Sequence, residues 1–254
     1  YYGIEYDYRV FASNTLGTAW SDVDTFTTLA PVTQGGVPVT DNLVVHYDAA
    51  EGVSSDGSGV LTWEDQSGNG HHATRASGNP ALVASVPEIN GLPAIETRGN
   101  NDYFNLAGTM FAREHYIVFR SRPDRTTWSS YGGILGQTSG RPSNYLTENN
   151  NTSFHNNQYP QGVSRNGTAL SGGFSLAPIN EYMVVKITVN AGDTAQQAYQ
   201  LGRADGYTCD LDLAEIIGYS DIKSGADESQ IGGYLALKYG ITTSYVGYEL
   251  PPSM

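Results

Sequence analysis

Short segments in which apolar and polar residues alternate recur along most of this chain, with turn residues between them. The clearest lies at 181–189, where one face carries Met183, Val185, Ile187 and Val189. Successive side chains of a strand point to opposite faces, so this pattern predicts a half-buried strand. Similar segments lie at 43–48, 60–64, 71–75, 94–97, 102–106, 115–121, 132–137, 145–148, 168–174 and 211–219. Their regular spacing, without helices between them, predicts an all-β fold, an antiparallel sandwich of two sheets.

The composition fits this prediction and excludes some classes of partner. The 254 residues include 30 glycines and 18 tyrosines, and only 15% are charged, which suits many short strands joined by turns. A formal net charge of -13 argues against nucleic acid and anionic membranes as partners. The apolar runs are too short to cross a bilayer.

The single cysteine, Cys209, excludes a disulfide within this chain, and we expect it to be a small buried apolar residue. Extracellular animal domains usually carry disulfides, so the chain is expected to come from a secreted or cell-surface bacterial protein. We also expect a monomer.

One helix is predicted near the end of the chain, over about 225–239. Ser224 followed by Asp227 is typical of a capped helix start, and Gly240 is suited to the position after a helix end. The apolar residues that share one face at helical spacing are Ile231, Tyr234, Leu235 and Tyr239. We expect this face to dock on the sandwich.

Residues 1–29 form a separate segment, in which two alternating strands flank a turn at 16–18. The pattern Y-x-Y-R-V-x-A-x-N-x-x-G-x-x-W-S-D resembles the closing strands of a fibronectin type III domain, of which only about the last third is present. An isolated hairpin is marginally stable, so it must pack on the main domain, pair with another copy or fray. We expect a linker at 30–40, the main domain at 41–246, and a tail or linker to further domains of a longer protein at 247–254.

Three parts of the main domain have distinctive sequence patterns. They read L-V-V-H-Y-D-A-A at 43–50, W-E-D-Q-S-G-N-G-H-H-A-T at 63–74, and D-L-A-E-I-I-G-Y-S at 212–220 with L-A-L-K-Y-G-I at 235–241. Together they resemble a bacterial laminin G-like domain of the concanavalin A-like lectin/glucanase superfamily. The resemblance implies a jelly roll with one concave sheet, glycan binding or adhesion, and a place beside the enzymatic domains of a larger secreted protein.

The resemblance also implies a structural calcium ion at a sheet edge. Calcium binds six to eight oxygens, and the turn after Trp63 offers backbone carbonyls beside acidic side chains. The candidate ligands are Asp65 and Asn69 with carbonyls of 66–70, and Asp48, Asp212 or Glu215 from across the sheet. The alternative is a turn held by its own side-chain hydrogen bonds.

A catalytic alternative rests on Asp210, Asp212 and Glu215 in the string C-D-L-D-L-A-E-I. Retaining glucanases of the concanavalin A-like fold carry E-x-D-x-E or E-x-D-x-x-E on a central strand, where two glutamates act as nucleophile and acid/base. This chain has an aspartate at the first position, and Glu215 points to the opposite face from Asp212 unless a bulge intervenes. The string matches the non-catalytic laminin G-like pattern better.

The richest supply of glycan-binding side chains lies at 98–160. Six of the thirteen basic residues fall within 98–141. Because basic side chains bind sulfate and carboxylate groups, the candidate ligands include sulfated and uronate-bearing glycans as well as neutral ones. The predicted ligand-binding residues are Arg120, Arg125, Trp128, Tyr131, Arg141, Asn144, Tyr145, His155 and Tyr159. The sequence thus favours a non-catalytic, lectin-like module that binds a polysaccharide. A glycoside hydrolase and an adhesion or spacer domain stay open as alternatives.

Overall fold

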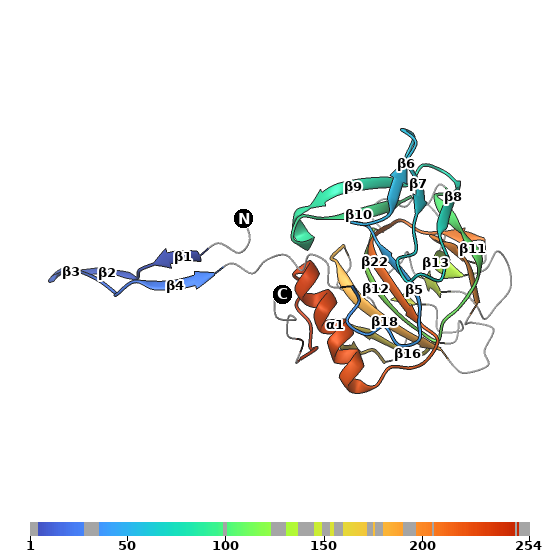
Figure 1. Cartoon of the computed structure of the whole chain (residues 1–254). Coiled ribbons are helices and arrows are strands. Elements are labelled where there is room, and N and C mark those ends of the chain that lie inside the picture. Colours follow the sequence, from blue (N-terminus) through green and yellow to red (C-terminus); the bar gives the residue numbers. More distant parts are fainter. Residues whose placement is uncertain are drawn as a thin grey trace. The chain divides into compact units, whose positions relative to one another are not determined.

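The computed structural model describes residues 5–27, 36–98, 101–122, 131–136, 145–148, 153–154, 160–171, 175, 180–189, 197–204, 206–246 and 248. The chain divides into two compact units, one formed by Tyr1–Gly36 with Leu250–Met254 and the other by Val37–Glu249. Within the smaller unit, β1 (Glu5–Tyr8) pairs with β4 (Asp24–Thr27) and β2 (Phe11–Asn14) pairs with β3 (Gly17–Trp20). The predicted hairpin is therefore present (Figure 1). Its fibronectin-like origin stays a prediction.

The larger unit spans Val37–Glu249, and the expected main domain at 41–246 lies within it. The second half of the predicted linker packs on this unit. Val37 is buried, and the hydroxyl of Tyr219 donates a hydrogen bond to the carbonyl of Val39 at 2.9 Å. The part of the expected linker that lies outside this unit ends at Gly36.

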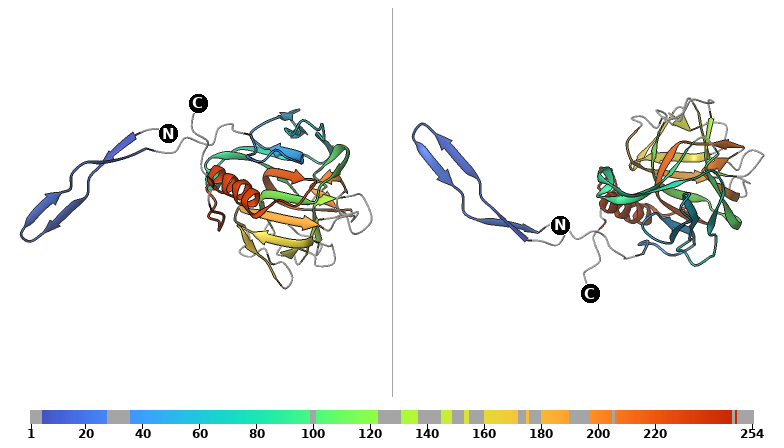
Figure 2. Two further views of the ribbon diagram at one scale, coloured as in Figure 1. Left: turned by 60° about the horizontal axis from the view of Figure 1, so that its bottom comes forward. Right: turned by 90° about the horizontal axis from the view of Figure 1, so that it is seen from above.

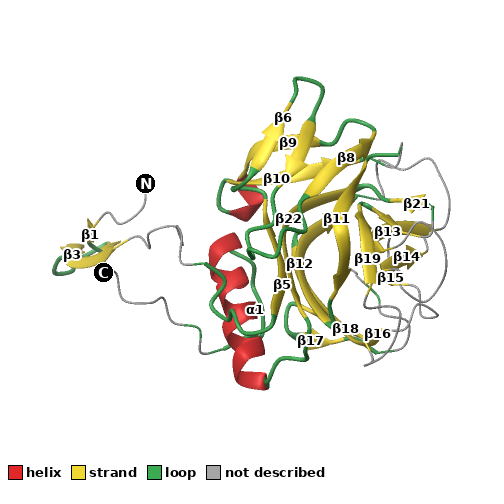
Figure 3. Ribbon diagram, turned by 45° about the vertical axis from the view of Figure 1, so that its right-hand side comes forward, coloured by secondary structure: helices red, strands yellow, loops and turns green. Residues whose placement is uncertain are grey.

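Two sheets of eight strands build the larger unit (Figures 1 and 3). The first runs in the order β17 (Thr168–Ala169), β16 (Pro160–Arg165), β18 (Met183–Val189), β12 (Glu114–Ser121), β22 (Leu211–Tyr219), β10 (Leu92–Thr97) and β9 (Ala81–Val86), and β5 (Leu43–Asp48) also pairs with β22. The second runs in the order β15 (Ser153–Phe154), β14 (Tyr145–Glu148), β13 (Tyr131–Gly136), β19 (Gln197–Leu201), β11 (Tyr103–Phe111), β8 (Ala73–Ser77), β7 (Val60–Trp63) and β6 (Val53–Ser55). The larger unit also contains the short strand pair β20 (Arg203–Ala204) and β21 (Tyr207–Thr208), the 3₁₀ turn η1 (Pro87–Ile89) and one α-helix. The all-β fold is confirmed, and the jelly-roll connectivity stays a prediction.

Apolar side chains from both sheets meet in one core. Trp63 and Phe104 of the second sheet are fully buried there, as are Phe119 and Ile117 of the first. The face of 181–189 predicted to be apolar also lies in this core, which confirms that strand. Cys209 is a buried member of the same core, as expected.

The sequence prediction of strands fails mainly where polar or small residues dominate. The sequence predicts one strand over 168–174, but the described strand there is only Thr168–Ala169. The strands of the larger unit that the sequence does not predict are β6, β9, β15, β16, β19, β20 and β21. Strand β9 is an edge strand whose residues are largely exposed or half-buried, so its alternation carries little hydrophobic signal.

Helix α1 (Gly225–Tyr239) has the predicted bounds and caps. The hydroxyl of Ser224 accepts a hydrogen bond from the Asp227 amide, and Gly240 ends the helix with a φ of 65°. The helix lies along the outer face of the first sheet, away from the second sheet (Figures 2 and 3). No helix in the described residues is long and apolar enough to span a membrane.

His115, on β12, is expected to make the free energy of unfolding depend on pH. Burial lowers the pKa of His115 from 6.5 to about 3. Between these values the unfolded chain binds a proton that the folded protein does not, so stability falls as the pH falls through this window. We expect a slope of about 1.4 kcal/mol per pH unit between about pH 6 and 5, measured by urea unfolding at a series of pH values. His115→Gln should flatten the slope, and an unchanged slope in this variant would contradict the assignment.

Candidate functional site

A bulge in β22 places Asp212 and Glu215 on the same face of the first sheet. In the ladder with β12, Leu213 pairs with Phe119 and Glu215 pairs with Val118, which leaves Ala214 unpaired. The other edge of β22 is shared: β10 pairs with residues 211–213 and β5 with residues 215–219. The bulge that the sequence required for the catalytic alternative is therefore present. The face on which both carboxylates lie, however, is the one that carries α1.

Glu215 lies beneath α1 and is fully buried. Its carboxylate accepts hydrogen bonds from His46 Nε2 at 2.8 Å, Tyr239 Oη at 2.8 Å and Lys238 Nζ at 2.7 Å, and from Tyr234 Oη at 3.2 Å. Burial by itself would raise the pKa of Glu215, but the Lys238 ammonium and His46 lower it to about 2. Glu215 is thus held as a carboxylate at neutral pH.

Lys238 also contacts a second buried carboxylate, that of Asp48 at the end of β5. Burial and the nearby charge of Glu215 raise the pKa of Asp48, although Lys238 opposes the shift. The aromatic rings of Tyr234 and Tyr239 lie 5.4 Å and 5.1 Å from the ammonium. We call these residues the Lys238 cluster: His46, Asp48, Glu215, Tyr234, Lys238 and Tyr239.

This geometry argues against the hydrolase alternative. The general acid of a hydrolase has to contact the substrate, whereas Glu215 is fully buried beneath the helix. Asp212 is also buried and is bound by the guanidinium groups of Arg120 at 2.7 Å and Arg122 at 3.2 Å. Asp210 is 2% exposed. Asp212 and Glu215 are therefore members of buried ion pairs, and all three carboxyl groups are buried.

The turn after Trp63 is held by its own side chains. The Asp65 carboxylate accepts hydrogen bonds from the backbone amides of His46 at 2.9 Å, Ser67 at 2.9 Å and His71 at 3.0 Å. The Asn69 amide donates to the carbonyls of Leu43 at 2.9 Å and Val44 at 3.0 Å. This pattern matches the alternative that the sequence left open.

The described residues do not fit a calcium ion at the expected place. The donor atoms of His46, Asp48 and Glu215 lie within 4.8 Å of one another, but Lys238 already binds both carboxylates. Calcium prefers oxygen ligands and needs six to eight, and this group contains an imidazole and an ammonium. Since the Asp65 carboxylate already accepts hydrogen bonds from three backbone amides, calcium stays a prediction that rests on the resemblance alone.

The predicted ligand-binding residues divide into three groups. Tyr131 and Tyr145 lie on β13 and β14 of the second sheet. Arg120 lies on β12 of the first sheet, so these strands do not bring the predicted set together on one sheet. The remaining predictions lie outside the described residues: Arg125, Trp128, Arg141, Asn144, His155 and Tyr159.

Arg120 lines an open cavity of about 330 Å³ beside the end of α1. Its guanidinium stacks on the Tyr182 ring at 4.6 Å, and donates to Asp212 at 2.8 Å and to Glu88 at 3.1 Å. We call this hollow the Arg120 cavity; it is lined by Glu88, Arg120, Asn166, Asn180, Glu181, Tyr182, Gly240, Ile241 and Thr242. The lining combines carboxylates, amides, hydroxyls and one aromatic ring.

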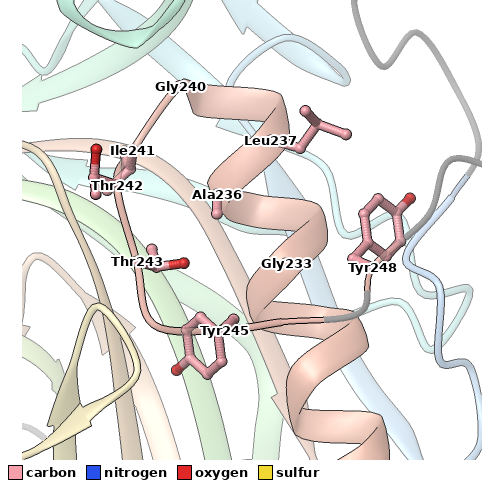
Figure 4. A pocket seen from close by; sticks show the side chains of 9 residues that line it. All are labelled: Gly233, Ala236, Leu237, Gly240, Ile241, Thr242, Thr243, Tyr245 and Tyr248. Carbon is pink, nitrogen blue, oxygen red and sulfur yellow. The ribbon is translucent and has the colours of Figure 1, made fainter.

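A second hollow, of about 460 Å³, lies between α1 and the segment that follows it (Figure 4). Tyr245 and Tyr248 of this segment pack where the helix has glycines. A Cβ atom on Gly232 would lie 2.4 Å from the Tyr245 ring, and one on Gly233 would lie 2.4 Å from Tyr248 Cβ. This second hollow has no charged side chain in its lining. It is the space left between the helix and the segment that packs on it.

Gly232→Val should displace Tyr245 and release the segment at 241–248. The lost packing should outweigh the helix propensity gained by replacing glycine, which is at most about 1 kcal/mol. Limited proteolysis should therefore cut the variant within this segment faster than the unsubstituted protein. Gly225→Ala is the matched control, because a Cβ there meets nothing within 4 Å. Equal cleavage of all three proteins would contradict the packing described.

Comparison with protein-family models, with curated proteins and with solved structures gives no match to this chain. The laminin G-like and fibronectin-like resemblances therefore stay predictions. The Lys238 cluster and the Arg120 cavity are two places in the described residues where charged and polar side chains converge.

Proposed function

We propose that this chain is a non-catalytic glycan-binding module and that a sugar binds in the Arg120 cavity. The observation that carries the proposal is the lining of this open cavity, which presents carboxylate, amide and hydroxyl groups around a guanidinium stacked on Tyr182. Sugar hydroxyls both donate and accept hydrogen bonds, so they need this mixture of partners. The volume of about 330 Å³ falls within the range of small-ligand sites.

The charges in the cavity favour a neutral glycan. Arg120 is already paired with Asp212 and Glu88, and Glu88 and Glu181 add negative charge to the rim. The other arginines of the 98–141 cluster that the structure describes are also engaged: Arg98 with Glu96, Arg113 with the Val189 carbonyl and Arg122 with Asp212. An anionic ligand would depend on Arg125 and Arg141, outside the described residues.

The setting of the module is part of the proposal and rests on the sequence. We propose that it belongs to a larger secreted or cell-surface bacterial protein, acts as a monomer and holds the other domains of that protein against a polysaccharide. An adhesion or spacer role is the remaining alternative, and it predicts no glycan affinity.

Affinity electrophoresis of the 254-residue chain against neutral, uronic and sulfated polysaccharides tests the proposal. We expect retardation by at least one neutral polysaccharide. Repeating the gels with a chelator tests the calcium prediction in the same experiment, since retardation that disappears would support an ion at the site. If no polysaccharide retards the protein, the glycan-binding proposal is wrong and the spacer alternative gains support.

A further inference from the structure

The Lys238 cluster places a buried amine between two buried carboxylates. Lys238 Nζ lies 2.5 Å from Asp48 Oδ2 and 2.7 Å from Glu215 Oε2. The exposed fractions are 7% for Lys238, 6% for Asp48 and 0% for Glu215. We propose that Lys238 and Asp48 become joined by a side-chain amide, an isopeptide bond, and that Glu215 relays the protons.

Three different segments supply the three groups: Asp48 ends β5, Glu215 lies on β22 and Lys238 lies on the last turn of α1. Folding therefore brings together a nucleophile, an electrophile and a base. Groups held in contact by a fold react far faster than the same groups free in water, because their translational entropy is already lost. Burial also excludes the bulk water that would reverse the reaction by hydrolysis.

The hydrogen bonds distinguish the two carboxylates. Glu215 accepts from His46, Tyr234 and Tyr239 besides Lys238, and these donors stabilise it as a carboxylate. Asp48 Oδ1 accepts from the Ala50 amide at 2.9 Å, while Oδ2 faces Lys238. The Ala50 N–H is therefore placed to stabilise negative charge on Oδ1 as the carbonyl carbon becomes tetrahedral. Glu215 is suited to the role of base, and Asp48 to that of electrophile.

The reaction balances without any further reagent. A proton passes from the Lys238 ammonium to Asp48 Oδ2, which leaves a neutral amine and a neutral carboxyl group. Nζ then attacks Asp48 Cγ, and Glu215 takes a proton from the attacking nitrogen and returns it to Oδ2. The Cγ–Oδ2 bond breaks, one water leaves and an amide between Nζ and Cγ remains.

The bond would close a loop of almost the whole larger unit, since the two residues are 190 positions apart in the chain. It would tie β5, near the start of the unit, to the helix at its end. A covalent clamp of this kind resists pulling and proteolysis, independently of whether the Arg120 cavity binds a glycan. Failure of either proposal therefore leaves the other standing.

Intact mass spectrometry of the denatured 254-residue chain tests the bond. The mass should fall below the sequence mass by one water, and a tryptic digest should contain a branched peptide that joins Asp48 to Lys238. A full sequence mass would overturn the proposal. So would a one-water deficit without this branched peptide, because dehydration at another site gives the same mass.

Variants test the assigned roles. Glu215→Gln should keep the full sequence mass although Lys238 and Asp48 are both present, and Lys238→Arg should do the same. Lys186→Arg is the control, because Lys186 forms a partly exposed ion pair with Glu228 of α1, and it should show the one-water deficit. A one-water deficit in Glu215→Gln would overturn the role of Glu215. If circular dichroism shows Glu215→Gln to be unfolded, the mass and peptide map of the unsubstituted chain decide alone.

Discussion

Replacing Lys238 with methionine should lower the free energy of unfolding at pH 7 by at least about 3–5 kcal/mol, the usual loss when one partner of a buried ion pair is removed. The substitution leaves Asp48 and Glu215, which are 6% and 0% exposed, without the ammonium that both carboxylates contact. Methionine fills most of the space, so packing contributes little to the loss. Urea unfolding followed by circular dichroism measures it.

The matched control is Lys186→Met, which removes a lysine paired with Glu228 of the same helix. Its ion pair is partly exposed, so the loss should stay below about 1 kcal/mol. Similar losses in the two variants would contradict the structural role given to the Lys238 cluster. If the proposed amide forms, Lys238 is no longer an ammonium, and the loss in Lys238→Met is then that of the cross-link, about 5 kcal/mol on the chain-entropy estimate for a loop of this length.

The second large effect is expected from Asp65→Ala in the turn after Trp63. The substitution removes the acceptor of three backbone amides, those of His46, Ser67 and His71. Asp65 is 5% exposed, so water replaces these charged hydrogen bonds poorly. We expect a loss of about 3–5 kcal/mol, because hydrogen bonds to charged groups contribute about 1.5–3 kcal/mol each and are not additive. Thermal and urea unfolding measure the loss.

Asp65→Asn separates the charge from the shape, since it keeps one acceptor oxygen and places an NH₂ group against an amide donor. Its loss should be smaller than that of Asp65→Ala but still larger than about 1 kcal/mol. Asp56→Ala is the surface control, because Asp56 pairs with Arg75 where the Asp56 side chain is 34% exposed. A loss in Asp65→Ala no larger than that of Asp56→Ala would show that the turn does not depend on this carboxylate.

The sequence predicted the strands and the helix best where burial imposes a strong period. The helix 225–239 has the predicted bounds because its buried face repeats at helical spacing, and the core face of 183–189 repeats at the spacing of a strand. The strand 211–219 also has the predicted bounds, although all nine of its residues are buried. The sequence does not predict the edge strands β6 and β9, because their residues are mostly exposed or half-buried and so show little hydrophobic pattern.

The Lys238 cluster shows what the sequence could and could not reveal. Lys238 follows Ile231 by seven positions and Tyr234 by four, so helical spacing places it on the buried face. A lysine on such a face is rarely buried without a partner, and this signal could have been used. Its partners Asp48 and Glu215 lie 190 and 23 positions away. Nothing in local sequence shows that β5 and β22 pair beneath the helix.

The candidate ligand surface was only partly predictable. The composition of 98–160 identified Arg120, and the structure places it in an open cavity. The neighbours that complete this cavity come from η1, the turn before β18 and the segment after α1, at Glu88, Glu181 and Thr242. They are distant in sequence and individually unremarkable, so only the fold brings them together.

The glycan-binding proposal is tested most directly by affinity electrophoresis that compares the unsubstituted chain with a Glu88→Ala/Glu181→Ala double variant and with Asp56→Ala. Glu88 and Glu181 have side chains 57% and 63% exposed, so their removal should leave the fold intact. We predict that a neutral polysaccharide retards the unsubstituted chain and Asp56→Ala equally, and the double variant much less. Equal retardation of all three proteins would contradict the Arg120 cavity as the site, and no retardation of any would contradict glycan binding itself.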